Sequence, residues 1–394
     1  MTQVLLCGAA VVTLSMGIRH GFGLWLQPVT MDRGWTRGTF AFAIAIQNLA
    51  WGLAGPFAGA LADRFGAMRV LMAGSLLYGL GLVGMGLATS GLAFTGSAGL
   101  LLGMAQSGTT YAVIYGVIGR NVAPEKRSWA MGVTAAAGSF GQFLMVPVEN
   151  WLIGSFGWQS ALFILGCLAL AIIPLAVGLK EPPQQALKGP QQSMAEAVRE
   201  ALGHRGFLLL MAGYFVCGFQ VVFIGIHMPS YLKDHGLTPN VATTALALIG
   251  LFNVIGTYAA GSLGAWLPKT YILSAIYALR SVAIVVFLTV PLTPWSVYIF
   301  ASVMGVLWLS TVPPTNAVVA QIFGVKYLSM LGGIVFVGHQ IGSFMGVWLG
   351  GKLYDATGSY DVVWWIAVAL GVIAALINLP VNEQPIVRPS AAPA

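Results

Sequence analysis

The chain has 394 residues, of which 58% are hydrophobic and only 7% are charged, and its formal net charge is +7. A soluble protein of this length carries roughly a quarter of charged residues, so the composition excludes a soluble enzyme or nucleic-acid-binding protein. We expect a multi-pass integral membrane protein of the plasma membrane or bacterial inner membrane, with the lipid bilayer as its surroundings and no nucleic acid partner.

Apolar stretches follow one another along the whole chain, and each is long enough to cross a bilayer as a helix at ~1.5 Å per residue. Strands of a membrane barrel would be shorter and would alternate in polarity, which these stretches do not. The predicted fold class is therefore an all-α integral membrane protein with twelve transmembrane helices in two six-helix bundles. The helices are expected at 4–29, 38–60, 68–89, 93–119, 129–150, 156–179, 206–232, 240–264, 270–290, 295–319, 327–351 and 360–381.

The longest polar interruption of this pattern is the segment 180–205, which opens with proline and glutamine. Within it, Ser193 and Glu196 form an S-x-x-E pattern that predicts a capping box at the start of a short amphipathic surface helix. The segment therefore divides the chain into an N-terminal bundle (1–179), a cytoplasmic linker (180–205) and a C-terminal bundle with a short tail (206–394).

The distribution of Lys and Arg predicts which way the helices face. If both termini are cytoplasmic, twelve of the eighteen Lys and Arg residues lie on cytoplasmic segments and two, Arg19 and Arg280, lie within spans. Only Arg33, Arg37, Lys233 and Lys352 then lie outside. This agrees with the excess of positive residues on the cytoplasmic side of membrane proteins, so both termini are expected in the cytoplasm.

The two halves also resemble each other in sequence at an offset of 200 residues. The stretch 130–143 is similar to 330–344, with Gly132 and Gly138 matching Gly332 and Gly338. A parallel repeat of two six-helix halves is one way in which transporters form a central site between two bundles.

The loop after the second predicted helix carries the stretch GALADRFGAMRV, residues 59–70. It resembles the G-x-L-x-D-R-x-G-x-R motif of the major facilitator superfamily. The resemblance implies a cytoplasmic gate in which the carboxylate of Asp63 pairs with Arg120 or with a helix N-terminus; the alternative is that the basic residues only fix the topology. The predicted gate residues are Gly59, Asp63, Arg64, Gly66, Arg69 and Arg120.

Further stretches resemble the bacterial monocarboxylate-porter-like branch of that superfamily, namely 17–28, 225–237 and 338–361. The resemblance covers nearly the whole chain. One departure concerns the eighth helix, where animal monocarboxylate carriers have an Asp and an Arg one turn apart. The matching positions here are Asn253 and Thr257, so an anion-binding charge must come from elsewhere.

Arg19 and His20 lie inside the first predicted helix, where a charge costs ~3 kcal/mol on insertion scales and must face a cavity or a partner. Polar residues also occur in the other helices that line the central path of this fold type. The predicted substrate-binding residues are Arg19, His20, Tyr111, Tyr115, His227, Asn253, Thr257, Arg280, Asn316 and His339. For each of them an alternative stays open: Arg19 and Arg280 can brace helices, the histidines can be neutral interior residues, and the tyrosines can serve packing.

No Asp or Glu lies at mid-depth, and Glu149 alone lies inside a predicted span, near its outer end. Two intramembrane cations without an acidic neighbour indicate an anionic substrate such as a carboxylate, which an arginine binds with two parallel hydrogen bonds. A cationic substrate is disfavoured because it needs an intramembrane anion.

The sequence therefore predicts a secondary transporter of a small organic anion, a monocarboxylate in the first place, that works by alternating access. Proton symport is the first mechanism, because histidine titrates in the physiological range, and anion exchange is the second. The alternative is a proton-antiport exporter of a neutral or amphiphilic molecule. No metal-binding, nucleophilic or nucleotide-binding motif supports a membrane enzyme, and we expect a monomer with no cofactor and no metal.

Overall fold

The computed structural model describes residues 2–121, 124–179, 193–264, 267–324 and 328–386, and the regular elements in these ranges are all helical. The first part of the chain forms α1 (Thr2–His20), η1 (Phe22–Trp25), α2 (Leu26–Arg33), α3 (Arg37–Phe65), α4 (Ala67–Leu87), α5 (Gly91–Phe94), η2 (Thr95–Leu101), α6 (Leu102–Thr109), α7 (Tyr111–Asn121), α8 (Pro124–Ala169) and α9 (Ile172–Val177). The second part forms α10 (Met194–Gly203), α11 (Arg205–Asp234), α12 (Pro239–Leu263), α13 (Lys269–Thr289), α14 (Pro294–Leu307), α15 (Val312–Phe323), α16 (Leu328–Thr357) and α17 (Asp361–Asn378).

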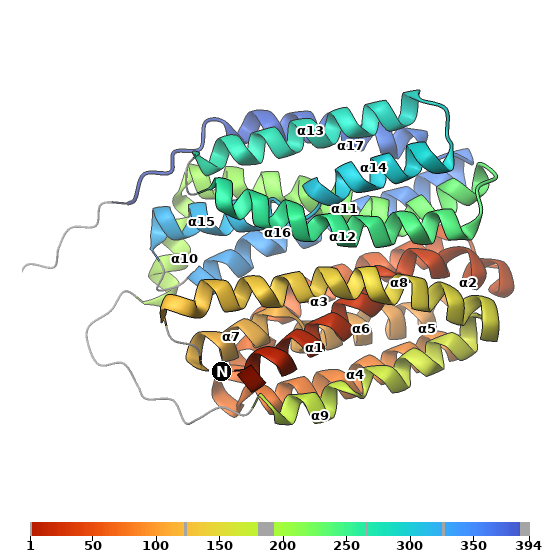
Figure 1. The fold of residues 1–394 in the computed structure, drawn as a ribbon, viewed down its shortest axis with the longest axis horizontal. Helices are drawn as coiled ribbons and strands as arrows, with labels where there is room; N and C mark the ends of the chain where they lie inside the picture. Colours follow the sequence, from red (N-terminus) through yellow and green to blue (C-terminus); the bar gives the residue numbers. More distant parts are fainter. Residues whose placement is uncertain (1, 122–123, 180–192, 265–266, 325–327, 387–394) are drawn as a thin grey trace, which may run out of the picture.

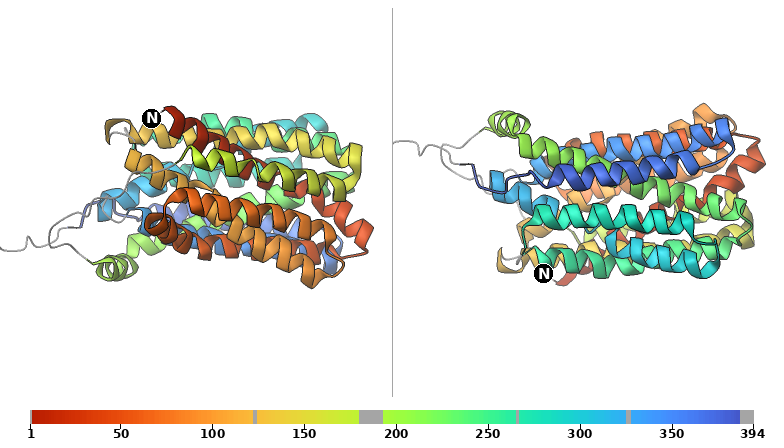
Figure 2. Two further views of the ribbon diagram at one scale, coloured as in Figure 1. Left: turned by 90° about the horizontal axis from the view of Figure 1, so that it is seen from below. Right: turned by 90° about the horizontal axis from the view of Figure 1, so that it is seen from above.

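The helices run side by side in two groups, one made of α1 to α9 and the other of α11 to α17 (Figure 1). The perpendicular views show the same elongated bundle, with the N-terminus and α10 at one end (Figure 2). We call this the α10 end. The opposite end, which carries α2 and the turn between α11 and α12, is called the far end.

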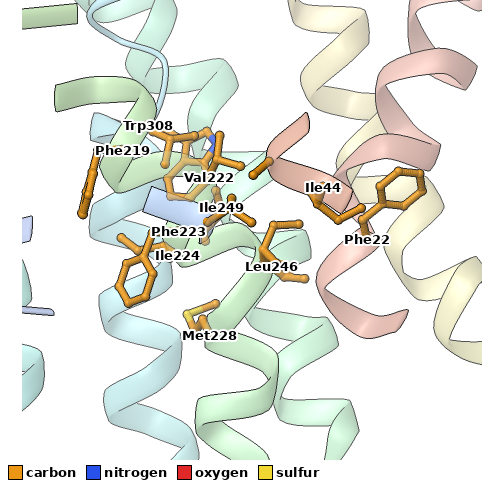
Figure 3. Close-up of a cluster of buried hydrophobic side chains, with 14 of the residues drawn as sticks. Phe22, Ile44, Phe219, Val222, Phe223, Ile224, Met228, Leu246, Ile249 and Trp308 are labelled. Atoms are coloured by element: carbon orange, nitrogen blue, oxygen red, sulfur yellow. The ribbon is translucent and has the colours of Figure 1, made fainter. Parts of the chain in front are cut away.

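The main contacts between the two groups are those of α3 along α16, of α8 along α12, and of η1 against α11. The last contact requires a glycine, because a Cβ atom at Gly23 would overlap the carbonyl oxygen of Gly225. One buried apolar cluster runs through the contact region, where Phe22 and Ile44 of the first group lie beside Leu246 and Ile249 of the second (Figure 3). The apolar core is therefore continuous across the two groups.

Within the described residues, ten helical stretches are long and apolar enough to cross a membrane, compared with twelve predicted spans. One of them, Val133–Val177, has 45 residues, about twice what one crossing needs. It contains Gly157 with a φ of 76°, so two predicted spans join there without a loop. Another predicted span, 93–119, is divided into the short elements α5, η2, α6 and α7. The twelve-span count and the side on which the termini lie stay predictions.

Several helix starts agree with the sequence. Helices α8, α12 and α14 begin at Pro124, Pro239 and Pro294, where the missing amide hydrogen and the fixed φ of proline suit a first turn. The predicted capping box is confirmed: the Ser193 amide donates to Glu196 Oε2 at 2.8 Å, and the Glu196 amide donates to Ser193 Oγ at 3.2 Å.

Two helices are interrupted at equivalent positions. Thr110 has extended backbone angles (φ −113°, ψ −163°) between α6 and α7. In the second group, α14 ends at Leu307 and α15 begins at Val312, and Ser310 in this second break lies 200 positions after Thr110. The offset equals the one predicted from the sequence repeat, so the two halves share this irregularity. A break inside a span frees backbone groups that need other partners.

Candidate functional site

Arg19 lies in the last turn of α1 and is half-buried. Its guanidinium donates to Asn48 Oδ1 on α3, and its Cζ lies 4.8 Å from the centroid of the Trp51 ring, a cation–π contact. Arg19 Nε is buried and has no hydrogen-bond partner. Among the described residues Arg19 forms no ion pair with a carboxylate. The side chain therefore keeps charge and donor capacity for a further partner.

Trp51 connects Arg19 to the first helix break and to the second half of the chain. Its Nε1 donates to Thr110 Oγ1 at 3.2 Å, and its ring meets the Phe336 ring of α16 edge-on at 5.3 Å. Phe336 in turn stacks on His339 with centroids 5.3 Å apart. Arg19 and His339, two of the predicted binding residues, are thus brought into one polar and aromatic region between α3 and α16, which we call the central site.

Buried polar atoms without partners gather around α3 in this region. They are Arg19 Nε, Gln106 Oε1 and Gln340 Nε2. Gln340 packs against Gly52, one residue after Trp51, and Gln106 donates at 3.5 Å to Gln47, one residue before Asn48. Buried groups of this kind are normally hydrogen-bonded, so a polar ligand or water is expected to satisfy them.

Arg280 has a different environment. It is fully buried, and its donors point at the second helix break. Nε and Nη2 donate to the Leu307 carbonyl at 3.1 and 2.6 Å, Nη2 also donates to the Trp308 carbonyl, and Nη1 reaches Gln220 Oε1 at 3.4 Å. Arg280 was expected either to bind substrate or to brace helices, and these contacts favour the bracing of helices. The guanidinium that was predicted to bind a substrate instead donates to the carbonyl groups that the helix break leaves without helical partners.

Asn253 and Thr257 also serve the second break. Asn253 Oδ1 accepts from the Leu309 amide at 3.0 Å and from Thr257 Oγ1 at 3.1 Å. Asn253 Nδ2 donates to Ser139 on α8 at 3.0 Å, so the same amide joins the two halves. The side chains at both positions are therefore neutral and belong to one hydrogen-bonded network.

The other predicted residues have local partners. His20 Nδ1 lies 2.6 Å from the Met16 carbonyl of its own helix, and Asn316 donates to the Val312 carbonyl at 3.0 Å. His227 is fully buried between the Val347 carbonyl (2.8 Å from Nε2) and the Tyr360 hydroxyl (3.3 Å from Nδ1), which favours its reading as a neutral interior residue. The Tyr111 hydroxyl packs over Gly138, and the Tyr115 side chain lies outside the described part of the structure.

The predicted gate after α3 is described only in part. Gly66 ends α3 with a φ of 89°, a backbone conformation that favours glycine, and its amide donates to the Ala62 carbonyl at 2.9 Å. Gly59 has open space where a Cβ would lie, and Arg69 is exposed. The side chains of Asp63, Arg64 and Arg120 lie outside the described residues, so the latch between them stays a prediction.

At the far end, a polar network joins the two halves. Arg37 at the start of α3 donates to both oxygens of Asp234, the last residue of α11, at 2.6 and 2.7 Å. Its guanidinium also donates to the Tyr360 hydroxyl at 3.0 Å and lies 3.9 Å from the centroid of the Tyr354 ring. Burial raises the pKa of Tyr360 and the nearby guanidinium opposes this, so the hydroxyl keeps its proton and accepts from Arg37. Gln27 donates to the same carboxylate at 3.1 Å.

Replacing Asp234 by asparagine is expected to open the far end more often. A partly buried bidentate pair is worth about 1 kcal/mol, which corresponds to an increase of about fivefold in the open population. A cysteine introduced at Ser359, in a chain without its natural cysteines, should react correspondingly faster with a water-soluble thiol reagent. Asp361→Asn, which removes an exposed carboxylate nearby, is the control. Equal reaction rates in the Asp234 and Asp361 variants would contradict a gating role.

Three residues of interest are not among the predicted site residues. Asn48 and Trp51 lie in the second predicted span, which is not one of the helices expected to line the path, although the polar pair Gln47–Asn48 inside an apolar run is a signal. Glu149 is expected near a helix end. In the structure it is fully buried.

Comparison with known proteins identifies relatives over nearly the full length. The model of the Major Facilitator Superfamily matches residues 5–324. The chain is 24% identical over 386 residues to the uncharacterized MFS-type transporter YcxA of Bacillus subtilis, covering 92% of this chain and 90% of that protein. It is 25% identical over 383 residues to monocarboxylate transporter 13 of Rattus norvegicus (93% and 86% covered) and 25% identical over 372 residues to monocarboxylate transporter 11 of Mus musculus (89% and 80% covered).

A similar fold is found in the crystal structure of a bacterial homologue of the human lysosomal transporter Spinster, in an inward-facing and unoccupied conformation. The TM-score is 0.76 at 17% sequence identity, with 96% of each chain covered. At this identity the likeness concerns the arrangement of the helices alone.

Proposed function

Because the chain belongs to the Major Facilitator Superfamily, a family of multi-pass membrane transporters, we propose that it carries a small organic anion of the monocarboxylate class by alternating access. The central site between the two halves is the proposed binding place. Protons are the proposed coupling ion, and the chain is proposed to act as a monomer.

The observation that carries the proposal is the state of Arg19. Its guanidinium has one hydrogen bond to a neutral amide, one aromatic face and an unpartnered Nε. Burying a charge so incompletely paired is unfavourable, and a carboxylate would supply the missing acceptors in the planar geometry that a guanidinium prefers. Arg280 differs, because its donors are engaged by carbonyl groups. Arg33 has contacts of the same kind as Arg19 and also an unpartnered Nε, but it lies at the far end and not in the central site.

The relatives support the substrate class. Two of the similar proteins are named monocarboxylate transporters, and they cover most of this chain. Asn253 and Thr257 leave the eighth span without a charge, so Arg19 in the first span is the proposed anchor. His339, joined to it through Trp51 and Phe336, offers an imidazole on the opposite half of the chain.

Proton symport is proposed ahead of anion exchange. A weak acid that enters with a proton crosses without net charge, so no dedicated carboxylate is needed in the central site. A proton-antiport exporter of a neutral or amphiphilic molecule is the second candidate, and the aromatic contacts of Trp51, Phe336 and Tyr214 around the site favour it. A membrane enzyme, the alternative without transport, is not proposed.

The test is uptake of labelled lactate, pyruvate and related acids by proteoliposomes that contain the purified protein. For a substrate that moves with one proton, a gradient of about one pH unit is expected to give about tenfold accumulation. A protonophore should remove it. Uptake driven only by an internal anion would favour exchange, and gradient-driven movement of neutral amphiphiles without any acid uptake would favour the exporter.

A further inference from the structure

Glu149 is a fully buried carboxyl group on α8 that the central site does not use. Its Oε2 accepts a hydrogen bond from Trp25 Nε1 of η1 at 2.8 Å, and its Oε1 is buried without any partner. Glu149 lies two helical turns before Gly157, where α8 bends, so it is about 12 Å from that turn along the helix axis. The side chain is thus enclosed by the bundle, on the side of the far end.

The surroundings of Glu149 contain no cation in contact with it among the described residues. Trp25 of η1 donates to it, and Gly21 between α1 and η1 packs on it. Arg19 and His20 lie on α1 just before Gly21. From α12, which packs along α8, and from α11, which packs on η1, no charged side chain bonds to Glu149.

An ionised carboxylate that is fully buried with one neutral donor and one unsatisfied oxygen has an unfavourable free energy. A protonated carboxyl group in the same place avoids most of this cost. The carboxyl group is therefore expected to carry a proton in this conformation. Buried acids without a cation partner inside membrane bundles are typical of proton relays.

Glu149 also lies against the irregular junction that carries Arg19. The α-helix ends at His20 and continues as a 3₁₀ turn from Phe22, and a Cβ atom at Gly21 would overlap Glu149 Oε2. Deprotonation places a negative charge against this junction. The free-energy cost of this unpaired charge falls if the junction moves so that Arg19, His20 or water reaches the carboxylate.

We propose that Glu149 binds the transported proton and that its loss of the proton moves the α1–η1 junction. The inference rests on the proposed proton coupling and names its site. In the arrangement described here the carboxylate and one proton form the carboxyl group, and the proton leaves to water when the junction moves. Arg19, two residues before Gly21, links this step to binding of the anion.

The first test does not depend on the substrate. Infrared spectroscopy of the purified protein near neutral pH should show the carbonyl stretching band of a protonated carboxyl group. Glu149→Gln, which keeps the shape and stays neutral, should remove this band. Glu383→Gln is the matched control, because Glu383, unlike Glu149, has a cation partner, Lys269, at 3.6 Å. A missing band in the parent protein, or a band that survives in Glu149→Gln, overturns the proposal.

The second test uses transport in proteoliposomes. Glu149→Gln is expected to lose the roughly tenfold accumulation that a gradient of about one pH unit drives, while exchange of labelled for unlabelled acid at equal pH continues. Glu149→Asp, which retains a titratable group, should keep the infrared band and part of the accumulation. Normal accumulation by folded Glu149→Gln, or loss of exchange together with accumulation, overturns the coupling role. If the parent protein carries no acid at all, the proposed function fails, and the infrared band still decides whether Glu149 holds a proton.

Discussion

Replacement of Arg19 by glutamine is expected to lower acid uptake by at least about 100-fold without loss of folded protein. Each hydrogen bond to a charged group contributes about 1.5–3 kcal/mol, and a carboxylate held by a guanidinium makes two of them. Glutamine retains a donor for Asn48 but supplies no charge. The measurement is initial uptake in proteoliposomes, together with the thermal unfolding temperature in detergent.

Two further variants separate the loss of charge at Arg19 from a general effect of removing an arginine. Arg19→Lys keeps the charge and loses the planar fork, so its uptake is expected between those of the parent protein and Arg19→Gln. Arg33→Gln is the matched control, because Arg33 at the far end donates to the Gly86 carbonyl at 3.1 Å and lies over Trp158. Unchanged uptake by Arg19→Gln, or an equal loss in Arg33→Gln, would refute Arg19 as the substrate anchor.

Replacement of Arg280 by methionine is expected to act on stability instead. The change removes the donors to the Leu307 and Trp308 carbonyls, and each buried group left without a partner costs about 1–3 kcal/mol. We expect a lower unfolding temperature and a smaller yield of folded protein. Thermal unfolding in detergent, followed by intrinsic fluorescence, measures this.

Lys269→Met on the same helix is the control for Arg280. Lys269 is half-buried, and its Nζ lies 3.6 Å from Glu383, longer than an ordinary hydrogen bond. The Lys269→Met variant should therefore show a much smaller change in unfolding temperature. If Arg280→Met were as stable as the parent protein and only substrate binding were lost, the bracing role would be wrong and Arg280 would be an anion anchor.

Much of the architecture followed from the sequence because it depends on local chemistry. The helical class follows from the length and composition of the apolar stretches, and the capping box at Ser193 depends on residues within one turn. The start of α12 at Pro239 depends on proline itself. These features need no knowledge of what packs against them.

The candidate site was harder to predict because its partners come from distant parts of the chain. The sequence left open whether Arg280 braces helices, and it did not show that this side chain would reach the Leu307 carbonyl from α13. The rotation of α3 brings Asn48 and Trp51 to Arg19, and periodicity alone did not fix that rotation. The burial of Glu149 could not be predicted either, because its hydrogen-bond donor, Trp25, lies 124 positions away in the sequence.

The two helix breaks differ in the hydrogen bonds that hold their free backbone groups, and this difference affects how easily each half can change conformation. At the first break the described bonds from other helices join neutral groups, Trp51 to Thr110 and Ser15 to Thr109. At the second, a buried guanidinium and an asparagine fix the free backbone groups. The first half can therefore bend at its interruption with less resistance than the second half, so a carrier built from two similar halves is expected to have an asymmetric transport cycle.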